Sequence, residues 1–157
     1  MSKIAPCLWY DNEAEEAAKF YVSLLPNSRI DRIMKSPADT PSGKAGTVLL
    51  VEFTLAGQRF QGLNGGPMFK FTPAVSLSID CKDQAEVDRL WDAILKNGGK
   101  ESQCGWITDR WGLSWQIVPH GIQDLYDDPV KGKRAMEAMM KMVKLDMAAL
   151  KRAYDGE

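Results

Sequence analysis

The chain carries one sequence pattern twice, and this duplication constrains its fold more than any other feature. Residues 14–27 match residues 84–97 at an offset of 70 (84 − 14), and both stretches are amphipathic with a polar, turn-forming end. Residues 57–61 match residues 112–116 at an offset of 55 (112 − 57), because the first half has a longer loop at 36–44. This duplication predicts a fold made of two similar supersecondary units, which can close around one cleft.

Each half is predicted to have the element order β-α-β-β-β. The helices are expected at 13–25, with Asp11 or Asn12 as the N-cap, and at 84–96. Short apolar or alternating runs between turn residues predict the strands, at 4–10, 29–35, 47–55 and 59–63 in the first half and at 74–80, 100–103, 105–109 and 114–118 in the second. Residues 122–155 are expected to be mostly helical, with an interruption at Gly132 and a new N-cap at Asp146.

The composition is that of one compact globular domain. A chain of 157 residues with 45% hydrophobic and 26% charged residues can bury a core of its own. A net charge of −1 favours neither nucleic acid nor a membrane as partner. Three cysteines without CxxC spacing and an N-terminus without a signal peptide favour a cytoplasmic protein with reduced thiols. We therefore expect a single domain, divided into repeat one (1–66), repeat two (67–120) and a helical tail (121–157).

Several segments along the sequence resemble those of a known family. The matching segments are PCLWYD at 6–11 with AEEAAKF at 14–20, LNGGP at 63–67, DCKDQAEVD at 80–88, CGW at 104–106, DRWGLSWQIVP at 109–119 and residues 136–154. The chain is similar to the PhnB-like branch of the vicinal oxygen chelate superfamily, which includes glyoxalases, bleomycin-resistance proteins and extradiol dioxygenases. The resemblance implies an α+β fold in which two βαβββ repeats form a cup of mostly antiparallel sheet.

The resemblance also implies four metal ligands, one on the first and one on the last strand of each repeat. Carried over by the repeat offsets, these positions are Pro6, Gln61, Ser76 and Gln116. Proline has no ligating side-chain atom, serine is a poor ligand for a transition metal, and two neutral amides do not offset a dication. A shift of one residue would place Cys7 in the set. We therefore predict that the protein uses neither a metal nor another cofactor.

Strand alternation then predicts a ligand pocket without a metal. Side chains at i and i+2 share a face, and the face of Gln61 and Gln116 combines amides, hydroxyls and apolar groups, a mixture that suits a small organic ligand. A closed or water-filled core is the alternative interpretation. The candidate ligand-binding residues are Leu8, Tyr10, Gln61, Leu63, Ser76, Ser78, Trp106 and Gln116, whereas Cys7, Trp9, Phe60, Trp115 and Ile117 are expected to pack under the helices.

Several other residues have a functional and a structural interpretation. Residues 64–67 could cradle an anion, but a tight connection between the repeats is the simpler reading. Cys104 would need a base or a cation nearby to act as a nucleophile. Asp80 and Asp109 could exchange protons or could bond locally at a strand end and a turn. No catalytic residue follows from these signals.

Apolar residues recur at helical spacing in the tail, from Met136 to Tyr154. We expect this stripe to dock on its own domain or on a second subunit, and we predict a homodimer. The function that the sequence favours is binding of a small molecule in a metal-free cup. A metal-dependent glyoxalase or dioxygenase and a ubiquinone-pathway methyltransferase are the alternatives; the latter is disfavoured because no glycine-rich turn follows the first strand.

Overall fold

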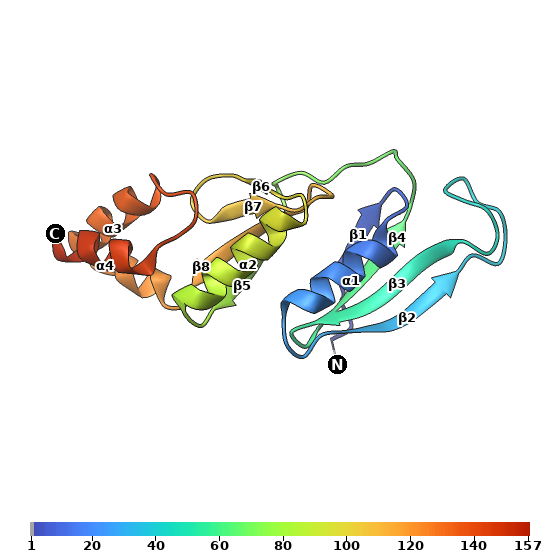
Figure 1. Ribbon diagram of the computed structural model, residues 1–157, viewed down its shortest axis with the longest axis horizontal. Coiled ribbons are helices and arrows are strands. Elements are labelled where there is room, and N and C mark those ends of the chain that lie inside the picture. Colours follow the sequence, from blue (N-terminus) through green and yellow to red (C-terminus); the bar gives the residue numbers. More distant parts are fainter. Residues whose placement is uncertain (1) are drawn as a thin grey trace. The chain divides into compact units, whose positions relative to one another are not determined.

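The computed structural model describes residues 2–157, which form two compact units, one ending at Phe71 and the other beginning at Thr72 (Figure 1). Unit 1 contains β1 (Cys7–Tyr10), α1 (Ala14–Leu24), β2 (Arg29–Lys35), β3 (Val48–Leu55) and β4 (Gln58–Asn64). Unit 2 contains β5 (Ser76–Cys81), α2 (Gln84–Lys96), β6 (Lys100–Glu101), β7 (Trp106–Thr108) and β8 (Ser114–Pro119), followed by the 3-10 helix η1 (Ile122–Tyr126), α3 (Lys131–Met139) and α4 (Met147–Asp155). The predicted β-α-β-β-β order is present in both units.

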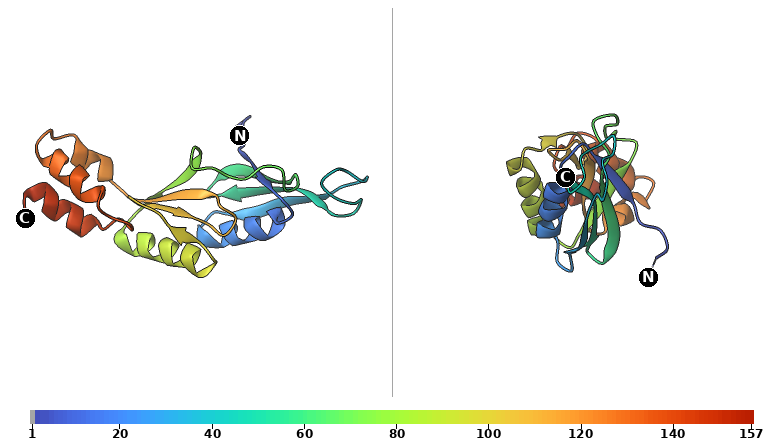
Figure 2. Two further views of the ribbon diagram at one scale, coloured as in Figure 1. Left: turned by 90° about the horizontal axis from the view of Figure 1, so that it is seen from above. Right: turned by 90° about the vertical axis from the view of Figure 1, so that its right-hand side faces the viewer.

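Each unit contains a four-stranded mixed sheet, and the two sheets share one topology. The strand orders are β1-β4-β3-β2 and β5-β8-β7-β6. The first strand of each unit pairs in parallel with the last, and the remaining pairs are antiparallel. In the left view of Figure 2, α1 and α2 each run along one face of the sheet of their own unit. The predicted α+β fold of two βαβββ repeats is thus confirmed.

Helix α1 buries its small and aromatic face on the sheet of unit 1. Ala14, Ala17 and Ala18 are at most 1% exposed and let the helix approach the strands closely. A methyl group on Gly62 of β4 would lie 3.3 Å from the Ala14 Cβ, so a side chain there would require α1 to move by a few tenths of an ångström. Tyr21 is fully buried, and its hydroxyl lies 2.8 Å from that of Tyr10.

The start of α1 differs from the prediction. Neither Asp11 nor Asn12 is the N-cap; Glu13 occupies that position and makes no side-chain capping bond. Instead, the Ala14 N–H donates to Asn64 Oδ1 at 2.9 Å, and the Asn64 amide donates to the Val48 carbonyl at 3.0 Å. A residue at the end of β4 therefore provides the acceptor for a backbone N–H that has no partner within the helix, 50 positions earlier in the chain.

Helix α2 is capped locally and buries larger side chains. Asp83 accepts a hydrogen bond from the Glu86 N–H, the usual N-cap arrangement. The buried stripe consists of Val87, Leu90, Trp91 and Ile94. At about 1.5–3 kcal/mol for each large apolar side chain removed from water, this stripe is a main attachment of the helix to its sheet.

The two units are related by different offsets in their strands and helices. The helices begin 70 residues apart (84 − 14), but β1 ends at Tyr10 and β5 at Cys81, which are 71 apart (81 − 10). The connection from strand to helix has three residues in unit 1 and two in unit 2. An offset of 70 therefore assigns the side chains of β1 to the wrong face, because one residue reverses the alternation.

The tail forms two short helices with a small core. The residues of this core are Ile122, Leu145 and Leu150, with partly buried methionines at 139, 142 and 147 around them. Gly132 does not interrupt α3; a side chain there would lie 2.9 Å from the backbone of Leu125 and Tyr126. Asp146 is the N-cap of α4, as predicted.

The predicted stripe is not one continuous face. The chain leaves the helix after Met139, and Met140 is 55% exposed. The segment between the helices is attached to unit 2, because Gln84 of α2 donates to the Leu145 carbonyl and accepts from the Met147 N–H, both at 2.9 Å. The tail thus docks on its own unit. None of the helices described between residues 2 and 157 is long and apolar enough to cross a membrane.

Asp109 organises the turn between β7 and β8. It is 4% exposed; Oδ1 accepts from the N–H groups of Trp111 and Leu113 at 2.9 and 3.0 Å, and Oδ2 accepts from the Trp115 indole at 3.0 Å. Of the two interpretations of this residue, the structure supports local bonding.

We expect Asp109→Ala to lower the free energy of unfolding by about 2–4 kcal/mol, because three donors lose a charged acceptor in a buried place. Urea denaturation followed by tryptophan fluorescence measures the change. Asp92→Ala, on the exposed side of α2, is the matched control and should change stability by less than about 0.5 kcal/mol. An equal loss in both variants would contradict the role given to Asp109.

Candidate functional site

The sheet of each unit has one face that its own helix covers and one that it does not, which we call the helix-free face. Cross-strand pairing assigns each side chain to a face. In unit 1, Phe60 stacks on Phe53 and Tyr10 contacts Tyr21, which places these residues on the helix-covered face. Their neighbours in the strands lie on the helix-free face of unit 1, namely Cys7, Trp9, Leu50, Glu52, Thr54, Arg59, Gln61 and Leu63.

The helix-free face of unit 1 combines apolar and polar groups. Cys7 pairs with Gln61, and Gln61 pairs with Glu52, so a thiol, an amide and a carboxylate lie side by side. Trp9 pairs with Leu63 in the adjacent position. The Trp9 ring packs edge-on against Phe69 at 5.0 Å between ring centroids, and its indole N–H donates to the Gly66 carbonyl at 2.9 Å.

The glycines after β4 hold Trp9 in place. A side chain on Gly65 would lie only 2.4 Å from the indole ring. In unit 1, the segment at 64–67 caps α1 through Asn64, and it seats the Trp9 ring through Gly65 and Gly66. These contacts give the segment a structural role. The close approach of the indole explains Gly65, and a left-handed backbone with φ of 98° explains Gly66.

The helix-free face of unit 2 is richer in hydroxyl groups. Ser78 and Trp106 both pair with Gln116, and Ser76 pairs with Ser114. The Gln116 amide donates to Ser76 Oγ at 2.9 Å. Trp115 and Ile117, which are 2% and 0% exposed, lie on the helix-covered face as predicted.

The predicted ligand-binding residues divide into two groups. Gln61, Leu63, Ser76, Ser78, Trp106 and Gln116 lie on helix-free faces. Leu8 and Tyr10 do not: they are 6% and 4% exposed and lie on the face that α1 covers, so their predicted placement is wrong. Cys7 and Trp9, expected under the helix, take their place because of the one-residue difference between strand and helix offsets.

Glu52 is a further residue of this face that the sequence analysis missed. It is partly buried in β3 between Val51 and Phe53, which point to the helix. A charged residue alternating with buried apolar ones in a strand is a signal for the opposite face. The alternation in TVLLVEFTL, residues 47–55, could therefore have identified it.

The residues at the family's metal-binding positions do not fit a transition metal. Strand pairing places Cys7, rather than the expected Pro6, opposite Gln61, and Ser78, rather than the expected Ser76, opposite Gln116. Two amides and a hydroxyl bind such ions weakly, and burial raises the pKa of the Cys7 thiol, which disfavours the thiolate. Within residues 2–157, no group of three or more histidine, cysteine or acidic residues could hold a metal ion.

His120 and Asp80 form an exposed pair where β8 and β5 end. His120 Nδ1 lies 2.8 Å from Asp80 Oδ2. This hydrogen bond, together with the carboxylate charge, raises the pKa of His120 above its ordinary value. Asp80 lies on the helix-free face because it pairs with Val118, two residues beyond Gln116. The pair places a histidine that can exchange protons near neutral pH at the end of this face.

The contacts of the other two cysteines, Cys81 and Cys104, indicate structural roles. Burial raises the pKa of the Cys81 thiol, on the helix-covered face, to about 12, so this thiol stays protonated. Cys104 has a left-handed backbone with φ of 59°. Its N–H donates to the Met142 carbonyl at 2.8 Å, which helps attach the tail to unit 2.

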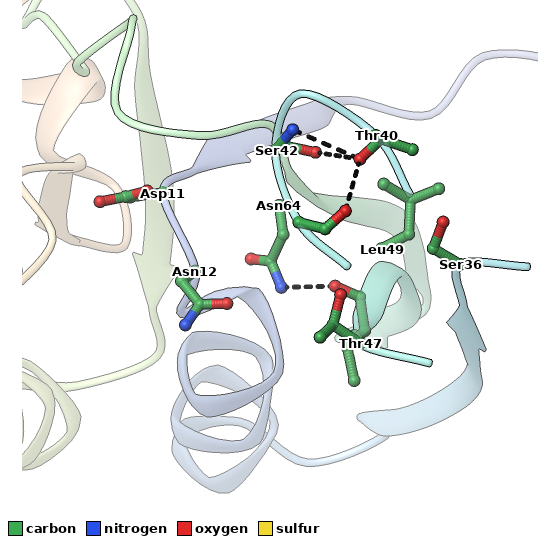
Figure 3. Close-up of a pocket in the computed structure, with 10 residues that line it drawn as sticks. Asp11, Asn12, Ser36, Thr40, Ser42, Thr47, Leu49 and Asn64 are labelled. Atoms are coloured by element: carbon green, nitrogen blue, oxygen red, sulfur yellow. Dashed lines mark hydrogen bonds between the residues drawn. The ribbon is translucent and has the colours of Figure 1, made fainter. Parts of the chain in front are cut away.

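A hollow of about 400 Å³ lies between the start of α1 and the loop at 36–47 (Figure 3). The polar groups that the loop contributes are bonded within the loop. Thr40 Oγ1 lies 3.0 Å from Ser42 Oγ, Ser36 donates to the Ala38 carbonyl at 2.6 Å, and the Asn64 amide is used on both sides. We attribute these loop side chains to loop structure; Asp11 and Asn12 complete the lining.

The family match and a solved relative of 34% identity place the chain in the vicinal oxygen chelate superfamily, whose glyoxalase-like fold consists of βαβββ units. Within that class, the chain belongs to the family described as 3-demethylubiquinone-9 3-methyltransferase, whose model matches residues 2–118. The PhnB protein of Bacillus cereus is 34% identical over 75% of this chain and 99% of its own, with a TM-score of 0.68.

More distant structures share the fold alone. A protein from Pseudomonas aeruginosa is 18% identical over 76% of this chain and 98% of its own, with a TM-score of 0.63. The fosfomycin resistance protein FosX from Listeria monocytogenes is 12% identical over 79% of this chain and 97% of its own, with a TM-score of 0.53. No curated protein matches the chain.

We expect NMR titration to give His120 a pKa above the ordinary 6.5 and Asp80→Asn to bring it back toward that value. Because the pKa is raised, the pair favours the folded state below the ordinary histidine pKa and loses this contribution as the pH rises through the folded value. Asp92→Asn is the charge-matched control. A His120 pKa that Asp80→Asn leaves unchanged would contradict the pairing.

Proposed function

We propose that this protein binds a small organic molecule, without a resident metal, on a helix-free sheet face. The observation that carries the proposal is the composition of the two helix-free faces. In unit 2 the Trp106 indole pairs directly with Gln116, and in unit 1 Trp9 and its partner Leu63 lie in the row next to that of Gln61. Apolar surface with a few polar groups at fixed positions is typical of sites for small organic ligands.

The donor chemistry supports a site without a metal. Amides and hydroxyls donate and accept hydrogen bonds, but they compensate a dication poorly. The structure of FosX from Listeria monocytogenes with Mn(II) shows that this fold can hold a metal in other proteins. In this chain the four side chains that pair on the first and last strands of the two units, Cys7, Gln61, Ser78 and Gln116, include no histidine and no carboxylate.

The family description names a methyltransferase, and we propose that methyl transfer is not the activity of this chain. A doubly wound S-adenosylmethionine domain places a glycine-rich turn after its first strand, whereas here β1 is followed by Asp11, Asn12 and Glu13. Fold alone does not decide chemistry, so calorimetric titration with S-adenosylmethionine is the direct test of this alternative.

The tryptophans provide an internal test of the binding proposal. In NMR spectra recorded with a set of small aromatic and amide-bearing compounds, we expect the indole N–H of Trp9 or Trp106 to shift. The indoles of Trp91 and Trp115 should not shift, because they donate to Glu101 and Asp109 on the helix-covered side. Equal shifts of all four indoles, or none with any compound, would contradict the proposal.

Elemental analysis of untagged protein purified without chelator tests the metal-free part of the proposal. Near-stoichiometric transition metal that is lost in Gln61→Ala and Gln116→Ala would move the function to metal-dependent lyase or dioxygenase chemistry. We expect no such metal, because the four side chains supply no imidazole and no carboxylate.

We also propose that the protein is a homodimer. The tail uses most of its apolar side chains within unit 2, so the support comes instead from large hydrophobic residues that are exposed, among them Ile4, Met68, Phe69 and Val75. Sedimentation at micromolar concentration should give twice the 17.5 kDa of one chain. A single species of monomer mass would contradict the dimer.

A further inference from the structure

The helix-free face of unit 1 is ordered in rows that run across its four strands. One row is apolar and consists of Trp9, Leu63, Leu50 and Met34, each paired with the next. The adjacent row is polar and consists of Cys7, Gln61, Glu52 and Arg32, also paired in sequence. A molecule lying on this face therefore meets hydrocarbon and an indole edge on one side and hydrogen-bonding groups on the other.

Two side chains in the polar row have unused hydrogen-bonding capacity. Within residues 2–157, no hydrogen bond or ion pair involves the Glu52 carboxylate or the Gln61 amide, although both are partly buried. In unit 2 the corresponding Gln116 donates to Ser76. Because partly buried polar groups are stabilised by partners, the difference between the two units points to Glu52 and Gln61 as the groups available to a ligand.

The charges around Glu52 restrict what that ligand can be. A hollow of about 270 Å³ is lined by Glu52, Thr54, Arg59, Arg29 and Asp31. In it, Asp31 accepts from Arg29 Nε at 2.7 Å and from Thr54 Oγ1 at 2.6 Å. Arg32 lies opposite Glu52 on β2. The three arginines repel a cationic ligand, and the two carboxylates repel an anionic one. A neutral hydrogen-bond donor is repelled by neither set of charges.

We propose that unit 1 recognises an aromatic or other apolar molecule through the row of Trp9, Leu63 and Leu50, and that a neutral donor on that molecule, a hydroxyl or an amide N–H, binds Glu52 and Gln61. This proposal rests on the proposed function and specifies its ligand class. Glu52 accepts the donated hydrogen, and the Gln61 amide donates to the oxygen of the same group. A hydrogen bond to a carboxylate contributes more than one between neutral groups.

Four matched probes test this recognition on the full-length protein. 2-Phenylethanol carries the donor, its methyl ether lacks it, and 2-phenylethylamine and 3-phenylpropionate carry opposite charges. Dissociation constants come from the NMR shifts of the Trp9 indole and the Gln61 side-chain amide. We expect the alcohol to bind about tenfold more tightly than the ether, and more tightly than either charged probe, on the basis of one hydrogen bond to a carboxylate.

Variants separate this inference from the proposed function. Glu52→Met should reduce the ratio between alcohol and ether to about one while the ether still binds; Glu15→Met, which removes the same charge from the exposed side of α1, should leave the ratio unchanged. Both variants change unit 1, so the Trp9 indole signal without a probe, which depends on the bond to the Gly66 carbonyl, reports whether that unit is folded. If Glu52→Met does not fold, Glu52→Gln should lower the ratio, because it keeps the shape and removes the charge.

Each outcome of these experiments decides between the proposals. An unchanged ratio in a folded Glu52 variant overturns the donor site and leaves the binding function intact. If no probe shifts Trp9 or Trp106, both the function and this inference fail. Shifts of Trp9 that depend on protein concentration without any probe identify a second copy of the chain as the occupant of this face, which also overturns the inference.

Discussion

Burial of one sheet face by one helix is the interaction on which the rest of each unit depends. In unit 1 the alanines of α1 pack against Gly62 and the Tyr21 hydroxyl meets that of Tyr10; in unit 2 Trp91 and Ile94 are buried in the same way. Once a helix has taken one face, strand alternation determines which side chains remain on the other. The candidate site thus consists of the strand side chains that the helix does not bury.

The element order, the two helices and the family were predictable from the sequence, because hydrophobic period and turn residues are local signals. The assignment of β1 to its face was not. It depended on copying a helix offset into a strand, and the connection before α1 is one residue longer than that before α2. Alternation within a single strand needs no offset, and it placed Phe60, Trp115 and Ile117 correctly relative to their neighbours. The face of Leu8 and Tyr10 is evident only from the structure, where strand pairing and the contact of Tyr10 with Tyr21 put both residues on the face of Phe60. The Asn64 cap was not predictable either, because its two partners are far apart in the chain.

The two units keep one topology but have diverged in chemistry. The Gln116 side chain donates a hydrogen bond to the Ser76 hydroxyl within unit 2. The equivalent Gln61 side chain lies between those of Cys7 and Glu52 and forms no side-chain hydrogen bond with either. Both units have glutamine at the equivalent positions 61 and 116, but the residues that pair with these glutamines differ, with Cys7 in unit 1 and Ser78 in unit 2. The shared topology therefore identifies the fold, whereas the chemistry of each face has to be read from its own residues.

The Asn64 cap has a consequence for how unit 1 is made. The first turn of α1 needs an acceptor that the ribosome adds 50 residues later, at the end of the strand that also pairs with β1. We therefore expect the first turn of α1 to stay frayed during synthesis until β4 has been made. Helix α1, the β1–β4 pair and the loop held through Val48 are then expected to become ordered together, late in the synthesis of unit 1 rather than from its N-terminus onward.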